Sequence, residues 1–154
     1  MDLKTKINAE EGTQELVITR VFDLPVELLF KAYTEPELVE QWMGTNVLKL
    51  ENKKHGSFQF ETSDAKGNTY RFNGAIHEFD PDQKITRTFE MENMPFGIQL
   101  EFLTFEKLTD DTSRLHIHTL YESVAQRNQM LKGGMAPGIN RAHNRLQDIV
   151  IKLK

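Results

Sequence analysis

The feature that most constrains the fold is the last stretch of the chain, residues 134–153, where apolar side chains recur at helical spacing. The repeating positions are Ile139, Ala142, Leu146, Ile149 or Val150, and Leu153. Almost everything between Leu16 and Tyr121 has instead the pattern of short strands, apart from one early helical patch. One long amphipathic helix preceded by so much sheet predicts that the sheet curls around the helix, so that each buries the other's apolar face.

The early helical patch is expected to form two short helices after the first strand. That strand is predicted over residues 16–22, and residues 1–14 before it form a polar lead-in. Asp23 followed by Pro25 marks a helix start, with Asp23 as the capping side chain and Pro25 in the first turn. The second helix begins at Pro36 and ends at Gly44.

The remaining strands form a meander that brings the sheet to about seven strands. They are predicted over residues 46–51, 57–62, 69–79, 84–91, 97–107 and 113–121. Short connections without crossover helices predict antiparallel pairing, hence an α+β fold. Gly74, inside the longest strand, indicates a bend or bulge. A helix capped by Ser123 is expected before the main helix. Gly133 and Gly134 are expected to kink or interrupt the chain between these two helices.

Size and composition exclude several classes of protein. A chain of 154 residues is expected to be a single domain. The net charge is −4 and no basic run occurs, which argues against a nucleic-acid surface. No apolar run is long enough for a membrane span, and no signal peptide is evident. The absence of cysteine excludes thiolate metal sites and cysteine nucleophiles, and we expect a cytoplasmic protein without a cofactor.

Three segments, in order, resemble the START-like (helix-grip, Bet v 1-like, SRPBCC) superfamily, in its Hsp90-ATPase-activator-homologue-like branch. The strand–helix–helix opening corresponds to residues 18–44, ITRVFDLPVELLFKAYTEPELVEQWMG, with Trp42 at the branch's usual tryptophan site. A Gly-x-(V/I)-x-Glu-(I/F)-x-Pro element corresponds to GAIHEFDP, residues 74–81. The Gly-Met-x-x-Gly helix opening that ends in Arg-Leu is similar to GGMAPGINRAHNRLQDI, residues 133–149.

The chain also departs from this pattern at a few positions. Met43 stands where the branch often has a second tryptophan, and His143 where an aromatic residue such as tyrosine is common. Glu101 and Phe102 interrupt the alternation of their strand, which leaves the inward parity there open. These changes are expected to reshape a pocket rather than remove it.

The resemblance implies an apolar cavity between helix and sheet that binds lipids, polyketide-like compounds or other hydrophobic small molecules. Some members catalyse cyclisation or hydrolysis, and the branch name implies a contact with the Hsp90 chaperone and a role in stress response. We therefore weigh three functions: non-catalytic binding of a hydrophobic or amphipathic molecule, an enzyme of cyclase or hydrolase type, and a chaperone-interaction module. A monomer and a homodimer both remain open.

The predicted pocket is mainly aromatic and aliphatic. Apolar walls with few polar groups are typical of small-molecule sites, although plain core packing would produce the same composition. Trp42 and the two short helices are expected to gate the entrance. The predicted pocket residues are Trp42, Phe58, Phe60, Tyr70, Phe72, Ile76, Met135, Ile139 and His143.

Three polar residues are candidates for chemistry. His143 lies near the buried stripe of the helix and could bind a ligand hydroxyl or carbonyl, or act as a base; alternatively it is a boundary histidine bonded to a strand carbonyl. Glu78 could act as a general base at the cavity mouth, or pair with Arg20, which shares the inward parity of Ile18 and Phe22. An enzyme would require Glu78 and His143 to converge on one cavity.

A metal site is the weakest candidate. His116 and His118 share one strand face, but Leu115 and Ile117 are expected to claim the inward face of that strand. A zinc site needs a third and usually a fourth ligand, which nothing nearby in the sequence supplies. We expect both histidines to point to solvent and no metal to bind.

Overall fold

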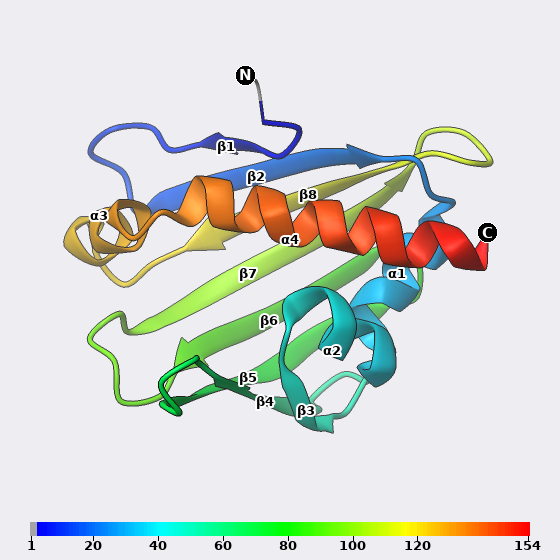
Figure 1. The fold of residues 1–154 in the computed structure, drawn as a ribbon. Helices are drawn as coiled ribbons and strands as arrows, with labels where there is room; N and C mark the ends of the chain where they lie inside the picture. Colours follow the sequence, from blue (N-terminus) through cyan, green and yellow to red (C-terminus); the bar gives the residue numbers. More distant parts are fainter. Residues whose placement is uncertain (1–2) are drawn as a thin grey trace.

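An antiparallel sheet of eight strands bends around one long C-terminal helix (Figure 1). The computed structural model describes residues 3–154. The strands are β1 (Lys6–Asn8), β2 (Glu15–Phe22), β3 (Asn46–Leu50), β4 (Ser57–Ser63), β5 (Thr69–Asp80), β6 (Lys84–Met91), β7 (Ile98–Lys107) and β8 (Ser113–Leu120). The helices are α1 (Val26–Thr34), α2 (Pro36–Met43), α3 (Val124–Lys132) and α4 (Met135–Val150), with a final 3₁₀ turn, Ile151–Leu153.

The strands follow the order β1-β2-β8-β7-β6-β5-β4-β3, and every neighbouring pair is antiparallel. Strand β2 therefore pairs with β8, the last strand of the meander. Along the chain, the two short helices connect β2 to β3, which is the strand at the opposite edge of the sheet. Helix α4 runs across the concave face, as Figure 1 shows. The predicted α+β helix-grip architecture, with two short helices after the first long strand, is confirmed.

The strand count differs from the predicted seven because the polar lead-in contains a strand of its own. Strand β1 pairs with β2, with Ile7 opposite Ile18. Just before it, Thr5 is buried, and its hydroxyl lies 2.9 Å from Nδ1 of His143 on α4. Three residues without apolar alternation give no sequence signal, so this strand depends on backbone pairing and on the contact of Thr5 with the helix.

Two predicted boundaries are wrong in detail. Helix α1 begins at Val26 with Pro25 at the N-cap and no side-chain cap, because Asp23 lies too far before the first turn to reach its N–H groups. Helix α4 ends at Val150, and Leu153 lies in the 3₁₀ turn with 55% of its surface exposed, outside the buried stripe. The other caps agree with the sequence: Gly44 ends α2 in the left-handed conformation, and Ser123 caps α3 through Gln126 N–H.

Gly74 has a packing role rather than the expected bend or bulge. The strand irregularity lies between Ile76 and Glu78, beyond Gly74. A Cβ at Gly74 would collide with the Thr88 carbonyl oxygen and with the ring of Phe58. Glycine is therefore required here because a neighbouring strand and an aromatic ring approach the backbone closely.

Candidate functional site

A cavity of about 580 Å³ lies between α4 and the concave face of the sheet. Its walls are predominantly apolar. The helices contribute Tyr33, Trp42, Met43, Met130, Met135, Gly138, Ile139, Ala142 and His143. The strands and the residue after β8 contribute Ile18, Phe72, Arg87, Phe89, Met91, Gln99, Glu101, Ile117, Thr119 and Tyr121.

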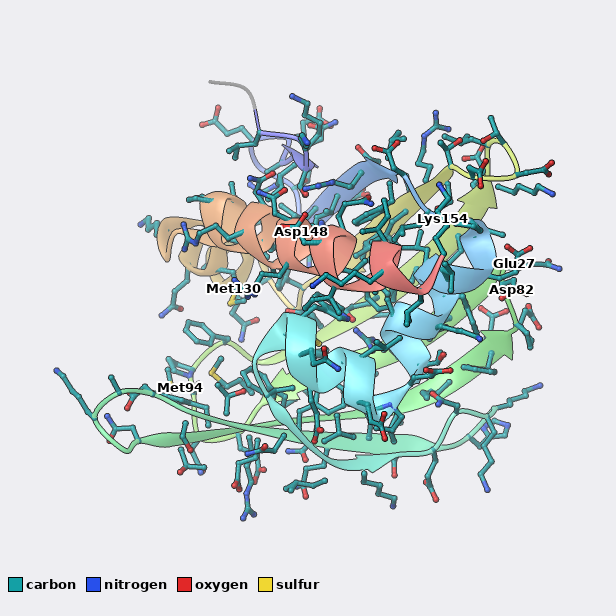
Figure 2. The ribbon with its side chains drawn as sticks, turned by 45° about the vertical axis from the view of Figure 1, so that its right-hand side comes forward. Glu27, Asp82, Met94, Met130, Asp148 and Lys154 are labelled. Atoms are coloured by element: carbon teal, nitrogen blue, oxygen red, sulfur yellow. The ribbon has the colours of Figure 1, made fainter. Side chains whose placement is uncertain are left out.

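The cavity occupies one end of the molecule. Met130 lies at the α3 end of α4, on the same side of the molecule as Met94 in the β6–β7 connection (Figure 2). Glu27, Asp82 and the C-terminal Lys154 lie at the opposite end, where α1 packs (Figure 2). Four of the lining residues are methionines, whose unbranched side chains adapt readily to an irregular surface.

A row of polar side chains crosses the sheet under the cavity. Arg87 on β6 lies opposite Glu101 on β7, and Glu101 lies opposite Thr119 on β8. Arg87 Nε donates to Glu101 Oε1 at 2.8 Å, and Gln99 Nε2 donates to Glu101 Oε2 at 2.8 Å. The Arg87 guanidinium also lies over the ring of Phe58, 5.0 Å from its centroid. An ion pair in such surroundings is tolerated because both carboxylate oxygens accept hydrogen bonds.

His143 lies on the cavity wall within a hydrogen-bonded network. Its Nδ1 lies 2.9 Å from the Thr5 hydroxyl and its Nε2 lies 3.4 Å from the Tyr33 hydroxyl. Arg20 Nη1 donates to Thr5 Oγ1 at 3.2 Å and to Asn144 Oδ1 at 2.8 Å. The histidine therefore bonds two hydroxyls rather than a strand carbonyl, and the network ties the N-terminal segment to α4.

Burial, and secondarily the charge of Arg20, lower the pKa of His143 to about 3. The imidazole is thus neutral throughout the ordinary pH range, and its low affinity for protons makes it a poor general base. Burial raises the pKa values of the Tyr33 and Tyr121 hydroxyls, so both stay protonated and can donate hydrogen bonds.

The residues predicted for the pocket fall into three groups. Trp42, Phe72, Met135, Ile139 and His143 line the cavity. Phe58, Phe60 and Ile76 are buried in the core and are not part of the lining. Tyr70 lies farther out along β5, where its hydroxyl donates to Asp64 at 3.1 Å.

Trp42 is a wall residue rather than an exposed gate. It is buried, and its indole N–H donates to the Ala32 carbonyl at 2.7 Å. Its ring centroid lies 5.0 Å from that of Tyr33, another lining residue. The two short helices are therefore joined to each other through this side chain.

Glu78 and Arg20 are not partners. Glu78 accepts from the Thr86 hydroxyl at 2.6 Å and pairs with Lys84 at 3.0 Å. Its neighbour Phe79 contacts Phe30 of α1 on the concave side, so alternation places Glu78 on the opposite face from His143. A shared role of Glu78 and His143 in one reaction is therefore excluded by their placement.

The polar row was not predicted from the sequence. In β6 the residues Ile85, Arg87, Phe89 and Met91 alternate toward the concave face, and this pattern is visible in the sequence. In β7 Glu101 takes the inward position and Phe102 the outward one, where it stacks on His118 with centroids 5.8 Å apart. An arginine and a glutamate, each at an inward position of successive strands, were the signal that could have found the pair.

The outer histidines behave as the alternation predicts. Leu115 and Ile117 are buried, whereas His118 lies on the other face and contacts Glu15 Oε2 at 2.6 Å. Within residues 3–154, no group of three or more His, Asp or Glu side chains is placed to hold a metal ion. In the same range, none of the helices has both the length and the apolar character needed to cross a bilayer.

A second hollow, of about 680 Å³, lies on the outside between α2 and the β3–β4 edge. Its lining is polar, with three glutamates among nine residues, Glu37, Glu40 and Glu61. Since apolar ligands require apolar walls, the cavity under α4 is the better candidate for a small-molecule site.

A curved antiparallel sheet closed by a C-terminal helix, with a cavity between them, defines a START-like helix-grip protein. Within that class, residues 23–150 match the family model described as "Activator of Hsp90 ATPase homolog 1-like protein". The chain belongs to this family, which confirms the resemblance found in the sequence. No curated protein matches the chain.

Solved structures share the fold over nearly the whole chain. A protein of Rhodobacter sphaeroides superposes with a TM-score of 0.87 at 19% identity, covering 97% of this chain and 99% of that one. Protein Ms6760 of Mycobacterium smegmatis superposes with a TM-score of 0.84 at 20% identity, covering 94% and 95%. A protein of Arthrobacter aurescens gives a TM-score of 0.85 at 16% identity, covering 96% and 91%. At these identities the likeness concerns the fold alone.

Proposed function

We propose that the protein binds a hydrophobic or amphipathic small molecule in the cavity between α4 and the sheet, without chemical conversion. The observation that carries this proposal is the cavity itself, at about 580 Å³. Pockets for small organic ligands usually measure roughly 300–1,000 Å³ and are mostly apolar with a few oriented polar groups. The apolar walls, the four methionines and the single polar row of this cavity fit that description.

Plain core packing, the competing interpretation, accounts poorly for the partly buried residues of α4. Met135, Ile139 and Ala142 face the sheet but keep part of their surface accessible, whereas Leu146 and Val150 on the same helix are fully buried. Because protein interiors are close-packed, a helix that needed only a core would be expected to bury its apolar stripe evenly. Unfilled apolar space next to accessible apolar side chains supports a ligand.

Titration with Nile red, an uncharged apolar dye, tests the proposal directly. We expect saturable fluorescence enhancement by the wild type, and we expect Ala142→Leu to weaken binding by at least roughly tenfold because the larger side chain fills the cavity. Ala125→Leu is the matched control, since Ala125 lies exposed on α3, away from the cavity lining. Equal dye affinity in Ala142→Leu and the wild type would refute cavity binding.

Native mass spectrometry of the freshly purified protein supplies the complementary measurement. We expect a mass increment corresponding to one bound organic molecule in the wild type, reduced in Ala142→Leu. A thermal-shift comparison of the two variants verifies that both are folded.

A contact with an Hsp90-type chaperone is the second candidate, and the family description favours it. Within residues 3–154, the exposed large apolar side chains come from separate parts of the fold: Val21, Leu48, Met94, Ile98, Leu108, Ile151 and Leu153. Protein docking sites usually present larger contiguous apolar patches. Pull-down with purified Hsp90, and stimulation of its ATPase activity, test this candidate independently of dye binding.

A further inference from the structure

Two polar groups in the cavity retain unused hydrogen-bonding capacity. Arg87 is 7% exposed, and its one side-chain hydrogen bond joins Nε to Glu101 Oε1. Its two terminal nitrogens have no hydrogen-bond partner among residues 3–154. Tyr121 is 5% exposed, and within the same described range its hydroxyl is closed off from water and has no partner. Within that range, the Tyr121 hydroxyl is therefore a buried donor without an acceptor, which is rare because it costs desolvation free energy.

The strand register places Tyr121 on the same face of the sheet as the polar row. Leu100 pairs with Leu120, so Gln99 and Tyr121 lie opposite each other at the next position along the two chain segments. Both are two residues away from the row that contains Arg87 and Glu101, and both lie on the same face of the sheet as that row. Gln99 donates to Glu101, so Arg87, Glu101 and Gln99 form one hydrogen-bonded cluster on the cavity floor, and Tyr121 lies beside Gln99 on the neighbouring chain segment. Tyr121 is itself one of the residues that line the cavity, together with four methionines whose unbranched side chains can change rotamer.

The charge of the cavity is balanced. Arg87 and Glu101 are the charged residues among those that line it, and they neutralise each other at 2.8 Å. A carboxylate ligand would leave one net negative charge in an apolar enclosure, which is strongly unfavourable. A neutral oxygen acceptor, in contrast, could take hydrogen bonds from the spare donors without disturbing the ion pair.

We propose that the cavity selects an uncharged amphipathic ligand that carries a ketone-type carbonyl, and that Arg87 Nη and the Tyr121 hydroxyl bind this oxygen. The inference rests on the proposed function and adds the chemical class of the ligand. It also gives the Arg87–Glu101 pair a role: Glu101 holds the guanidinium in place while its remaining N–H groups face the ligand.

The test compares three compounds as competitors of Nile red: diphenylmethane, benzophenone and diphenylacetate. A purely apolar cavity would prefer diphenylmethane, because benzophenone must desolvate its carbonyl. We expect the opposite order in the wild type, with benzophenone binding about fivefold more tightly than diphenylmethane, and diphenylacetate more weakly than benzophenone. Tighter binding of diphenylmethane or of diphenylacetate would overturn the inference while leaving cavity binding intact.

Two variants assign the preference to residues. Tyr121→Phe removes only the hydroxyl, and the double variant Arg87→Met with Glu101→Met replaces the ion pair by apolar side chains of similar length, an exchange that is often tolerated. We expect each to lose the preference for benzophenone over diphenylmethane, while diphenylmethane, which has no carbonyl, still binds. Tyr70→Phe is the control, because Tyr70 bonds Asp64 outside the cavity.

The results separate the two proposals. An unchanged benzophenone preference in both variants would overturn the assignment to Arg87 and Tyr121. Failure of the wild type to bind Nile red or any of the three compounds would overturn the proposed function and this inference together.

Discussion

The two ends of the interface between α4 and the sheet differ in how they are filled. At the end near α1, Leu146 and Val150 are fully buried, and Phe30 inserts between Phe79 and Phe105 with ring centroids 5.4 and 5.0 Å away. At the end near α3, the same helix leaves a cavity. The difference shows that one helix is too narrow to cover a curved sheet by itself. The end near α1, here called the closed end, is filled because α1 supplies aromatic rings, whereas the end near α3, the open end, contains the cavity.

The sheet beneath the two ends differs in polarity as well. The row Ile85–Leu103–Ile117 is entirely apolar, whereas the next row toward α3 is Arg87–Glu101–Thr119. Burying a charged group in a close-packed apolar core costs desolvation free energy, and this cost is smaller where unfilled space or a ligand lies next to the group. The change from apolar to polar therefore coincides with the change from packed to open.

Truncation of Leu146 should give the largest loss of stability. Leu146→Ala removes a fully buried side chain at the closed end and should lower the free energy of unfolding by about 4 kcal/mol. Ile139→Ala, at the open end, should cost only about 1 kcal/mol because the side chain already borders empty space. Chemical denaturation measures both, and equal losses would contradict the distinction between the ends.

Breaking the ion pair is expected to have the next largest effect. Arg87→Met alone leaves Glu101 without its cation and should cost about 3 kcal/mol, whereas the addition of Glu101→Met should restore most of it. A double-mutant cycle in urea provides the measurement. Additive losses in the double variant would mean that the two side chains are not coupled.

His143 lies between the two ends and should make stability depend on pH. Its folded-state pKa is about 3, below the ordinary value, so the unfolded chain binds a proton first as the pH falls. The stabilising contribution is complete above about pH 6.5 and should fall by about 2 kcal/mol on going to pH 5. The difference in unfolding free energy between wild type and His143→Gln should shrink by that amount, and a constant difference would disprove the shift.

The smallest expected effect is a gain at the open end. Gly138 lies inside α4, and a Cβ there would meet nothing closer than Arg141 Nη2 at 4.0 Å. Gly138→Ala should therefore raise the free energy of unfolding by about 0.8 kcal/mol through helix propensity. Thermal denaturation checks this, and a loss of stability would indicate a hidden contact.

The sequence predicts the helix and most strand bounds, because periodicity and turn residues are local signals, and the family resemblance implies the place of the cavity. The ion pair between Arg87 and Glu101 was not predicted because it depends on the register of two strands, and the sequence of a single strand does not reveal that register. Tyr70 shares the inward parity of Phe72, yet it lies beyond the cavity lining, since parity fixes the face of a strand but not how far the helix reaches along it. Strand β1 was not predicted because Ile7 is the one apolar residue among its three residues.

Trp42 has a practical consequence. It is the only indole in the chain, it stands on the cavity wall, and its N–H is already held by the Ala32 carbonyl at 2.7 Å. Its intrinsic emission therefore comes from a single fixed position on the wall of the cavity. On the proposed function, a change in the emission of Trp42 reports occupancy of the cavity, so that ligands without any colour of their own can be ranked without a dye.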